Sequence, residues 1–157
     1  MNKEQLLNFV VDAHQHGYAS GQSAPSKKEV DGSTTIEYGS GEWKHHDNFF
    51  GGEPYGGREV VFYQGKPVWM MVYYGRVNDN ASEVSKVYEV LQGALRTVSQ
   101  EAPFRGAKQF EHEGYRYDNE WQGDVERFTG KEAILQGETE IYSAEYLGGL
   151  VDQRGEQ

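Results

Sequence analysis

The feature that most constrains the fold is a pair of runs at residues 59–63 and 67–74, rich in β-branched, aromatic and Met side chains. They flank Gln64-Gly65-Lys66, a short glycine-containing connection that favours a β-hairpin. In each run, apolar side chains occupy both alternating sets of positions, whereas a strand with one wet face is apolar in only one set. We therefore expect a central hairpin that is covered on both faces.

The N-terminal segment has the apolar spacing of an amphipathic helix. Asn2 and Gln5 are placed as a capping box at its start, and Gly17 marks its end. The residues that share the apolar face are Leu6, Phe9, Val10 and Ala13.

A second helix is predicted from Val84 to Val98, where apolar residues again recur at helical spacing. Asn80 followed by Glu83 resembles another capping box, and Pro103 lies beyond the end. Between the first helix and the hairpin, residues 18–33 are small and polar and predict a surface loop.

The remaining segments predict short strands rather than helices. They are residues 34–38, 42–46, 109–110, 115–117, 125–128, 133–135 and 140–147, with 148–151 expected as the last turn and edge. Because no βαβ alternation is present, the fold class is α+β: a curved antiparallel β-sheet of about six to seven strands with two helices packed on one face. We expect residues 1–157 to form a single domain, with 152–157 as a frayed tail.

Composition limits the partners. A net charge of -10 and a pI near 4.9 argue against nucleic-acid binding, which needs concentrated Lys and Arg. The absence of Cys rules out disulfides and thiolate chemistry. No signal peptide or membrane span is evident, so we expect a cytoplasmic protein that is a monomer or a weak homodimer.

The histidines do not predict a metal site. His45 and His46 are adjacent on an expected strand and point to opposite faces, and His14 and His16 are expected on the surface of a helix. We therefore expect no metal and no cofactor. The glycine-rich residues 51–57 lack the Lys-Ser/Thr ending of a P-loop and indicate turns, or a lid over a pocket.

The candidate ligand site is built around Arg76, a cation at the end of an otherwise apolar strand. One interpretation is a structural ion pair with Glu59 or Asp47, and the other is an anchor for an anionic small molecule. On the second interpretation the domain is a binding or sensory module that holds a small polar or anionic molecule, or a peptide, in a pocket between sheet and helices. The residues predicted to bind that ligand are Tyr55, Arg58, Glu59, Trp69, Tyr74 and Arg76.

Two other functions stay open. A small hydrolase would use Asp47, Glu59 or Asp124 as an acid or base, and would require two of these carboxylates to converge in a deep pocket. A homodimeric protein-interaction module would use Trp and Tyr faces.

Several motifs together carry a family resemblance: YQGKPVW at residues 63–69, YYGRV at 73–77, APFRG, GYRYDNEWQGDVERFTGKEAI and YLGGLV. In these the chain resembles a bacterial family known only as domain of unknown function 5680, whose members occur alone or behind a helix-turn-helix segment of regulator-like proteins. The resemblance implies a sensory or binding role. It implies no activity, and no DNA binding follows because this chain has no helix-turn-helix of its own. Leu147 stands where the family often has His.

Overall fold

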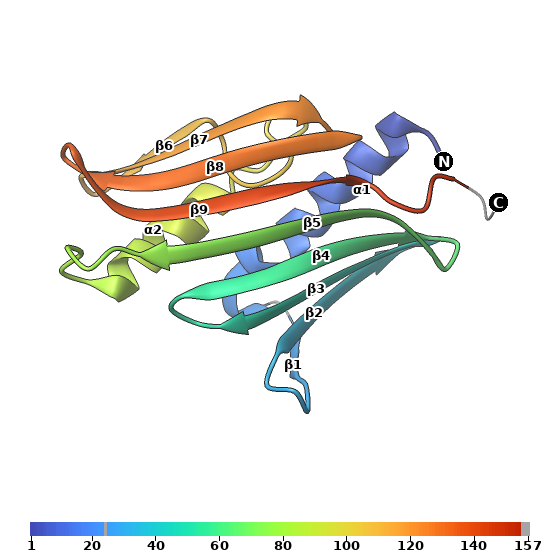
Figure 1. Cartoon of the computed structure of the whole chain (residues 1–157), viewed down its shortest axis with the longest axis horizontal. Coiled ribbons are helices and arrows are strands. Elements are labelled where there is room, and N and C mark those ends of the chain that lie inside the picture. The colour runs from blue at the N-terminus through green and yellow to red at the C-terminus, as the bar shows by residue number, and fades with distance from the viewer. Residues whose placement is uncertain (24, 155–157) are drawn as a thin grey trace.

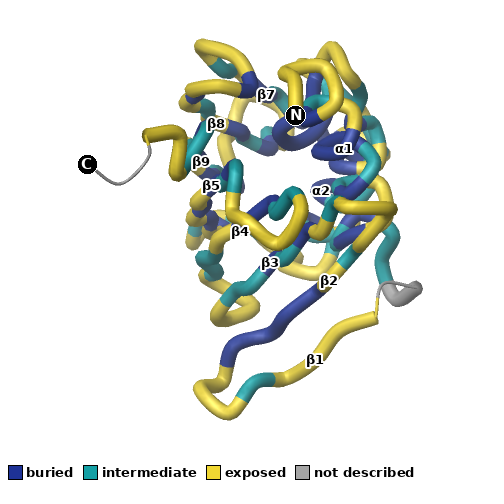
Figure 2. Tube along the Cα trace, turned by 90° about the vertical axis from the view of Figure 1, so that its right-hand side faces the viewer, coloured by how far each residue is buried: buried dark blue, intermediate teal, exposed yellow. Residues whose placement is uncertain are grey.

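The computed structural model describes residues 1–23 and 25–154, and in that part of the chain nine strands form one antiparallel sheet with two α-helices on one of its faces (Figures 1 and 2). The elements are α1 (Lys3–His16), the 3₁₀ helix η1 (Tyr18–Ser23), β1 (Ser26–Lys28), β2 (Thr34–Ser40), β3 (Trp43–Gly51), β4 (Tyr55–Tyr63), β5 (Lys66–Val77), α2 (Val84–Leu95), β6 (Gln109–His112), β7 (Tyr115–Asp124), β8 (Arg127–Gln136) and β9 (Thr139–Leu150). The predicted α+β class is confirmed, but nine strands exceed the six to seven expected.

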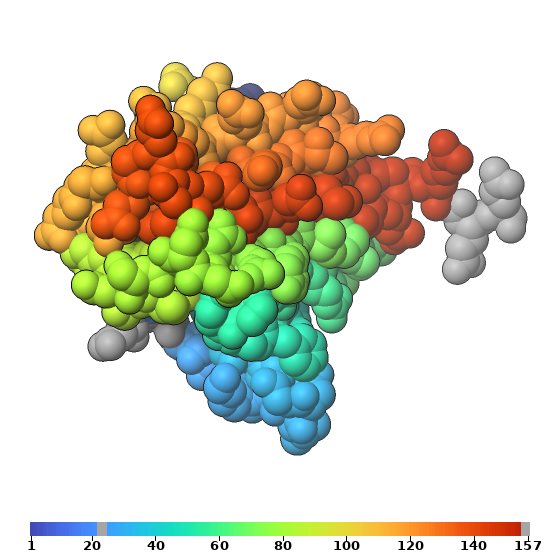
Figure 3. All heavy atoms as spheres, turned by 60° about the vertical axis from the view of Figure 1, so that its left-hand side comes forward, coloured from blue at the N-terminus to red at the C-terminus, as the bar shows by residue number. Residues whose placement is uncertain are grey.

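The strand order is β1-β2-β3-β4-β5-β9-β8-β7-β6. Two antiparallel meanders, β1–β5 and β6–β9, are therefore joined where β5 pairs with β9, in a register that sets Tyr73 opposite Tyr146. Figure 3 shows the join from outside, with the red residues of β9 between the green residues of the hairpin and the orange residues of β8. The prediction that residues 148–151 form a final turn and edge is wrong, because β9 continues to Leu150 and lies in the middle of the sheet.

The predicted first helix is confirmed with its capping box. The Asn2 side chain accepts a hydrogen bond from the Gln5 backbone, and the Gln5 side chain accepts one from the Asn2 backbone. The helix buries Leu6, Phe9 and Val10, and it lies over β2 and β3.

The second helix is shorter than predicted. It runs from Val84 to Leu95, and its N-cap is Glu83, which makes no side-chain capping bond, so the capping box proposed with Asn80 is wrong. After Leu95 the backbone closes into tighter turns, in which the Thr97 N–H donates to the Ala94 carbonyl. In the described residues, no helix is long and apolar enough to cross a lipid bilayer.

The prediction that the central hairpin is covered on both faces is wrong. Along β5 burial alternates strictly: Trp69, Met71 and Tyr73 are buried, whereas Val72 and Tyr74 are exposed. The apolar residues of the outer set remain at the surface because folded proteins leave much apolar area in contact with water. The sheet therefore has one inner face, toward the helices, and one outer face.

Residues 18–23 and 25–33 are more regular than the predicted loop. They contain η1 and β1, and Ser33 is buried where β1 turns into β2. Residue 24 lies outside the described residues, as do residues 155–157, so the tail predicted to fray at 152–157 is described only as far as residue 154.

Glycines allow three tyrosine rings to lie flat across the inner face. Each glycine sits directly opposite its tyrosine on the neighbouring strand, and a Cβ there would overlap the tyrosine side chain. At two of the glycines the nearest tyrosine atom would be 2.6 Å away. The pairs are Gly57 with Tyr73, Gly75 with Tyr55, and Gly130 with Tyr146. Because the rings lie down, their hydroxyl groups reach sideways to polar partners on the same face.

We expect Gly130→Ala to lower the free energy of unfolding by about 1–3 kcal/mol, because the added methyl overlaps the buried Tyr146 ring. Urea denaturation measures this. Gly52→Ala is the matched control, since a Cβ at Gly52 meets nothing within 4 Å. Equal stability losses in the two variants would contradict the flat-ring packing.

Candidate functional site

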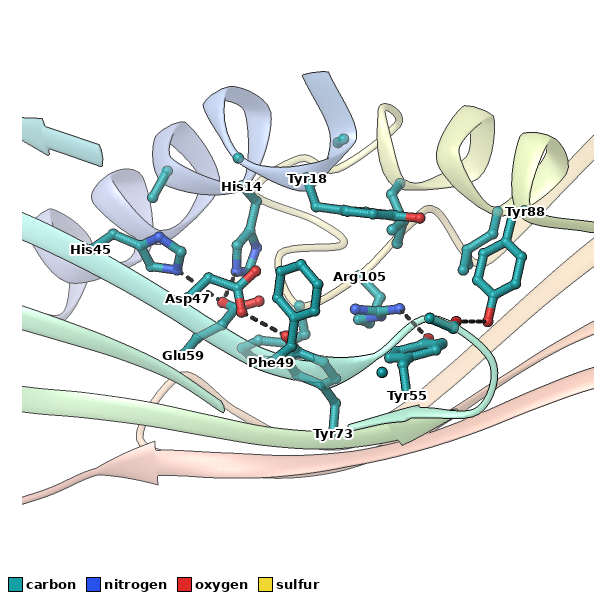
Figure 4. A pocket seen from close by; sticks show the side chains of 18 of the residues that line it. His14, Tyr18, His45, Asp47, Phe49, Tyr55, Glu59, Tyr73, Tyr88 and Arg105 are labelled. Carbon is teal, nitrogen blue, oxygen red and sulfur yellow. Dashed lines mark hydrogen bonds and ion pairs between the residues drawn. The ribbon is translucent and has the colours of Figure 1, made fainter. Parts of the chain in front are cut away.

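A cavity of about 430 Å³ lies between the inner face of the sheet and the two helices. Helices α1, η1 and α2 form one wall, strands β3, β4 and β5 form the other, and the segment after α2 adds Phe104 and Arg105. Figure 4 shows that His14, His45, Asp47 and Glu59 gather toward one end, and Tyr55 and Tyr88 lie toward the other. The side chains that line it with polar groups or rings are His14, Tyr18, His45, Asp47, Phe49, Glu53, Tyr55, Glu59, Tyr73, Tyr88, Phe104 and Arg105.

At the first end, two imidazoles contact one carboxylate oxygen. Nε2 of His14 lies 2.5 Å from Oε2 of Glu59, and Nε2 of His45 lies 3.1 Å from the same atom. Burial alone would raise the pKa of the Glu59 carboxyl, but His14 and then His45 outweigh it and hold that pKa well below its usual range. Burial alone would lower the pKa of His14, but Glu59 outweighs it and raises that pKa. His14 and Glu59 thus form a buried ion pair.

Asp47 lies beside this cluster, directly opposite Glu59 in the β3–β4 register. Burial, together with the neighbouring Glu59 charge, raises the pKa of Asp47 to about 7. The Tyr73 hydroxyl donates to Oδ1 of Asp47 at 2.6 Å. The Tyr73 ring also faces Arg105, whose guanidinium carbon lies 5.6 Å from the ring centroid.

Arg105 forms the second buried ion pair, with Glu132 of β8. Its Nε and Nη2 donate to Oε1 of Glu132 at 3.1 and 2.6 Å, and its Nη2 also donates to the Tyr55 hydroxyl at 3.3 Å. Tyr117 and Tyr142 complete the shell by donating to Glu132 at 2.6 and 2.9 Å. Burial alone would lower the pKa of Arg105, but Glu132 outweighs it, so that pKa is raised.

The loop between β3 and β4 closes the far end of the cavity. Glu53 accepts hydrogen bonds from the Val77 backbone N–H at 2.7 Å and from the Tyr88 hydroxyl at 2.5 Å. The loop is therefore tied to both β5 and α2. The turns predicted for residues 51–57 are partly wrong, because Gly56 and Gly57 belong to strand β4.

Of the six residues predicted to bind a ligand, Tyr55 and Glu59 line the cavity. Trp69 is fully buried in the core, where its Nε1 donates to the Val125 carbonyl at 2.9 Å. Arg58 and Tyr74 lie on the outer face of the sheet.

Arg76 also lies on the outer face and does not reach the cavity. Its side chain is 50% exposed and its Nη2 is 3.5 Å from Asp79, so the ion pair predicted with Glu59 or Asp47 is wrong. The reason is the period of two along β5, which turns Tyr73 inward and Arg76 outward. The cation that lines the cavity is Arg105.

Most of the cavity residues were missed from the sequence, among them His45 and both cations, His14 and Arg105. His14, predicted to lie at the surface, has a side chain only 10% exposed. Its position was detectable, because Leu6, Val10 and His14 follow one another at intervals of four on the buried face of α1. Arg105 lies in a Pro-Phe-Arg-Gly link that has no periodicity to indicate which way its side chain points.

The hydrolase alternative retains two of its three carboxylates. Asp47 and Glu59 are both buried and line the same cavity. Asp124 lies at the surface and pairs with Lys3. A catalytic role for the buried pair stays a prediction.

A model of the family described as domain of unknown function (DUF5680) matches residues 47–151, more than half of the chain. No curated protein and no solved structure matches.

We expect Arg105→Met to lower the free energy of unfolding by about 3–5 kcal/mol, because Glu132 would be left as an unpaired charge in the core. The double variant Arg105→Met/Glu132→Gln should recover much of that loss, since it also removes the charge. Urea denaturation measures all of these variants. Arg116→Met is the surface control: it breaks the more exposed pair with Asp118 and should change stability by about 0.5 kcal/mol or less. A single variant as stable as the double would contradict the buried pair.

We expect the protein to lose stability as pH rises above about 10, the ordinary pKa of tyrosine. Burial, as the main cause, raises the pKa of Tyr55 to about 12, and the pKa values of Tyr117 and Tyr142 also rise. Since the unfolded chain releases these protons first, their contribution is complete below pH 10 and is lost as pH rises through the folded pKa.

Phenolate absorbance at 295 nm, followed during alkaline titration of folded and urea-unfolded protein, tests this. In the folded protein part of the signal from the eleven tyrosines should appear late, and Tyr55→Phe should remove part of that late signal. Superimposable titration curves for the folded and unfolded protein would refute it.

Proposed function

The chain belongs to the family described as domain of unknown function (DUF5680), and since that description names no activity, we propose from the cavity that the protein binds a small, largely apolar molecule with polar groups at its ends. The observation that supports this best is a cavity of about 430 Å³ with aromatic walls and polar groups at separate places. Its size falls within the range of about 300–1,000 Å³ that is usual for small-molecule sites.

The walls suit an apolar body. Tyr18, Phe49 and Phe104 present rings to the cavity, and Leu91 and Leu95 of α2 add aliphatic surface. Burying apolar area of a ligand against such walls contributes about 25 cal/mol per Å².

The polar groups suit a neutral ligand better than an anion. His14 is already paired with Glu59, and Arg105 with Glu132, so each cation of the cavity has its own counter-ion. Within the described residues, Nη1 of Arg105 has no hydrogen-bond acceptor, and it can donate to a hydroxyl, carbonyl or amide oxygen of a ligand. Of the two kinds of ligand predicted from the sequence, polar and anionic, the cavity therefore favours the polar, uncharged kind.

A sensory role would use this binding without turnover. The β3–β4 loop contacts both β5 and α2 through Glu53. A ligand in the cavity would therefore change the positions of the loop and of the helix. This supports a binding module more than it supports a rigid interaction surface.

The test uses N-phenyl-1-naphthylamine, a neutral apolar dye whose fluorescence rises in an apolar site. We expect binding with a micromolar Kd. Ala13→Leu fills the cavity from α1 and should weaken binding by about tenfold or more, which corresponds to about 1.4 kcal/mol. Ala133→Leu, the same substitution on β8 away from the cavity, should leave the Kd unchanged.

Ala19→Leu is a second filling variant, in case Ala13→Leu disturbs the packing of α1. Circular dichroism establishes that each variant is folded. If the dye does not bind, or if it binds both filled variants as tightly as the parent, the proposed site is wrong.

A further inference from the structure

Three metal-ligating side chains meet in the wall of the cavity. His14, His45 and Glu59 each offer one donor atom, and these three atoms lie within 4.8 Å of one another. They come from α1, β3 and β4, so the fold, rather than a local sequence motif, brings them together. All three are buried or nearly so, with side chains no more than 10% exposed.

The fold orients these donors for a shared partner. Glu59 opposes Asp47, two residues from His45, so Glu59 and His45 are diagonal neighbours on the inner face. His14 reaches them from the helix above (Figure 4). Its Nδ1 donates to the Pro103 carbonyl at 2.8 Å. Because a carbonyl can only accept, Nδ1 carries a proton and the Nε2 of His14 is the atom available as a ligand. Metal-bound histidines are usually held in this way by an outer hydrogen bond.

We propose that His14, His45 and Glu59 bind a divalent first-row transition metal ion, with the remaining coordination position directed at the cavity. Two imidazoles and one carboxylate suit zinc or iron, whereas magnesium and calcium prefer oxygen ligands throughout. Three protein ligands with an open position are also the arrangement of catalytic rather than structural zinc sites.

The two distances to Glu59 require only a small adjustment, and the donor atoms of the two imidazoles lie within 4.8 Å of each other. A zinc ion bonds imidazole nitrogen at about 2.0–2.1 Å, which sets tetrahedral ligand atoms about 3.3 Å apart. The Nε2 of His45 is already 3.1 Å from the Glu59 oxygen, and the Nε2 of His14 would have to move from 2.5 Å by less than about 1 Å.

The positive charge of Arg105 acts on His14 and opposes a second cation, but Glu132 already offsets that charge. The ion displaces the proton between His14 and Glu59, which is released to solvent, and the proton that Nε2 of His45 donates to Glu59, which moves to Nδ1 of the same ring. Nδ1 of His45 has no hydrogen-bond partner in the described part of the chain, so the ring can turn without breaking another bond. Asp47 adds a further carboxylate beside the ion, which favours a divalent cation over a proton.

A second cluster at the surface provides a comparison. Glu89, His112 and Glu113 also bring three donor atoms together, but both carboxylates are exposed and the cluster contains a single imidazole. Lys86 contacts both carboxylates of this cluster and competes with any cation. The surface cluster therefore serves as the matched control.

This inference does not rest on the proposed small-molecule binding, and its test uses the metal alone. Protein stripped of metal with a chelator is titrated with Co²⁺, followed by its visible absorption, and with Zn²⁺, followed by calorimetry. We expect one equivalent of each ion. We expect metal binding to weaken by about a hundredfold or more in each of the variants His14→Gln, His45→Gln and Glu59→Gln. This loss is larger than the one expected from removing a residue that only hydrogen-bonds to a metal ligand. Glu89→Gln and His112→Gln should leave it unchanged.

X-ray absorption of the zinc-loaded parent tests the ligands with no substitution. Two imidazoles at about 2.0–2.1 Å and an oxygen shell support the site. Because this measurement uses the parent protein, it remains valid even if a cavity variant does not fold. Failure of the parent to bind Co²⁺ or Zn²⁺ at 100 µM protein, or binding abolished by the surface variants alone, would overturn the proposal. Dye binding by a parent that takes up no metal would leave the cavity function intact and remove only the metal site.

Discussion

The fold depends on pairing two carboxylates that are buried between the sheet and the elements above it. Glu132 on β8 is fully buried and meets Arg105 from the segment after α2, and Glu59 on β4 meets His14 from α1. Each carboxylate thus has its cation on the opposite layer. Buried ion pairs add little net stability compared with apolar packing, but removing one partner is costly. The two pairs therefore specify which part of the sheet each covering segment can occupy.

The tyrosines of the inner face make this arrangement possible. Tyr73, Tyr55 and Tyr146 lie across glycines, and their hydroxyls reach Asp47, Arg105 and Asn119 respectively. A small residue opposite a large ring is what lets a polar atom at the end of the ring lie level with the sheet. The inner face is consequently apolar over its area and polar at chosen points, as a ligand-binding wall needs to be.

Apart from the capping box at Asn80, local patterns predicted the local structure well, and they predicted the long-range structure less well. The capping box at Asn2 and the hairpin around Gly65 depend on neighbouring residues, and both are present. The face that each hairpin residue occupies was not predictable, because Val72 and Tyr74 are as bulky as their buried neighbours and differ from them only in what covers the sheet. Of the cavity cations, His14 continued a visible helical stripe, whereas Arg105 lies in a segment without period.

The segment that matches the family contains Glu59, Arg105 and Glu132, while His14 and His45 precede it. Both members of the Arg105–Glu132 pair are thus part of the family segment, whereas the two imidazoles are not.

The central place of β9 has a consequence for how the chain acquires its structure during translation. Strands β1–β5 can pair as they emerge from the ribosome, because each lies next to its predecessor. The other edge of β5 stays unpaired until β9 is made, and β9 is the last of the strands to be synthesised. Such long-range pairing carries a large loop-closure cost and slows folding. An unpaired apolar strand is also a template for association with other chains. A nascent chain of this protein is therefore most exposed to aggregation between the completion of β5 and the release of residue 150.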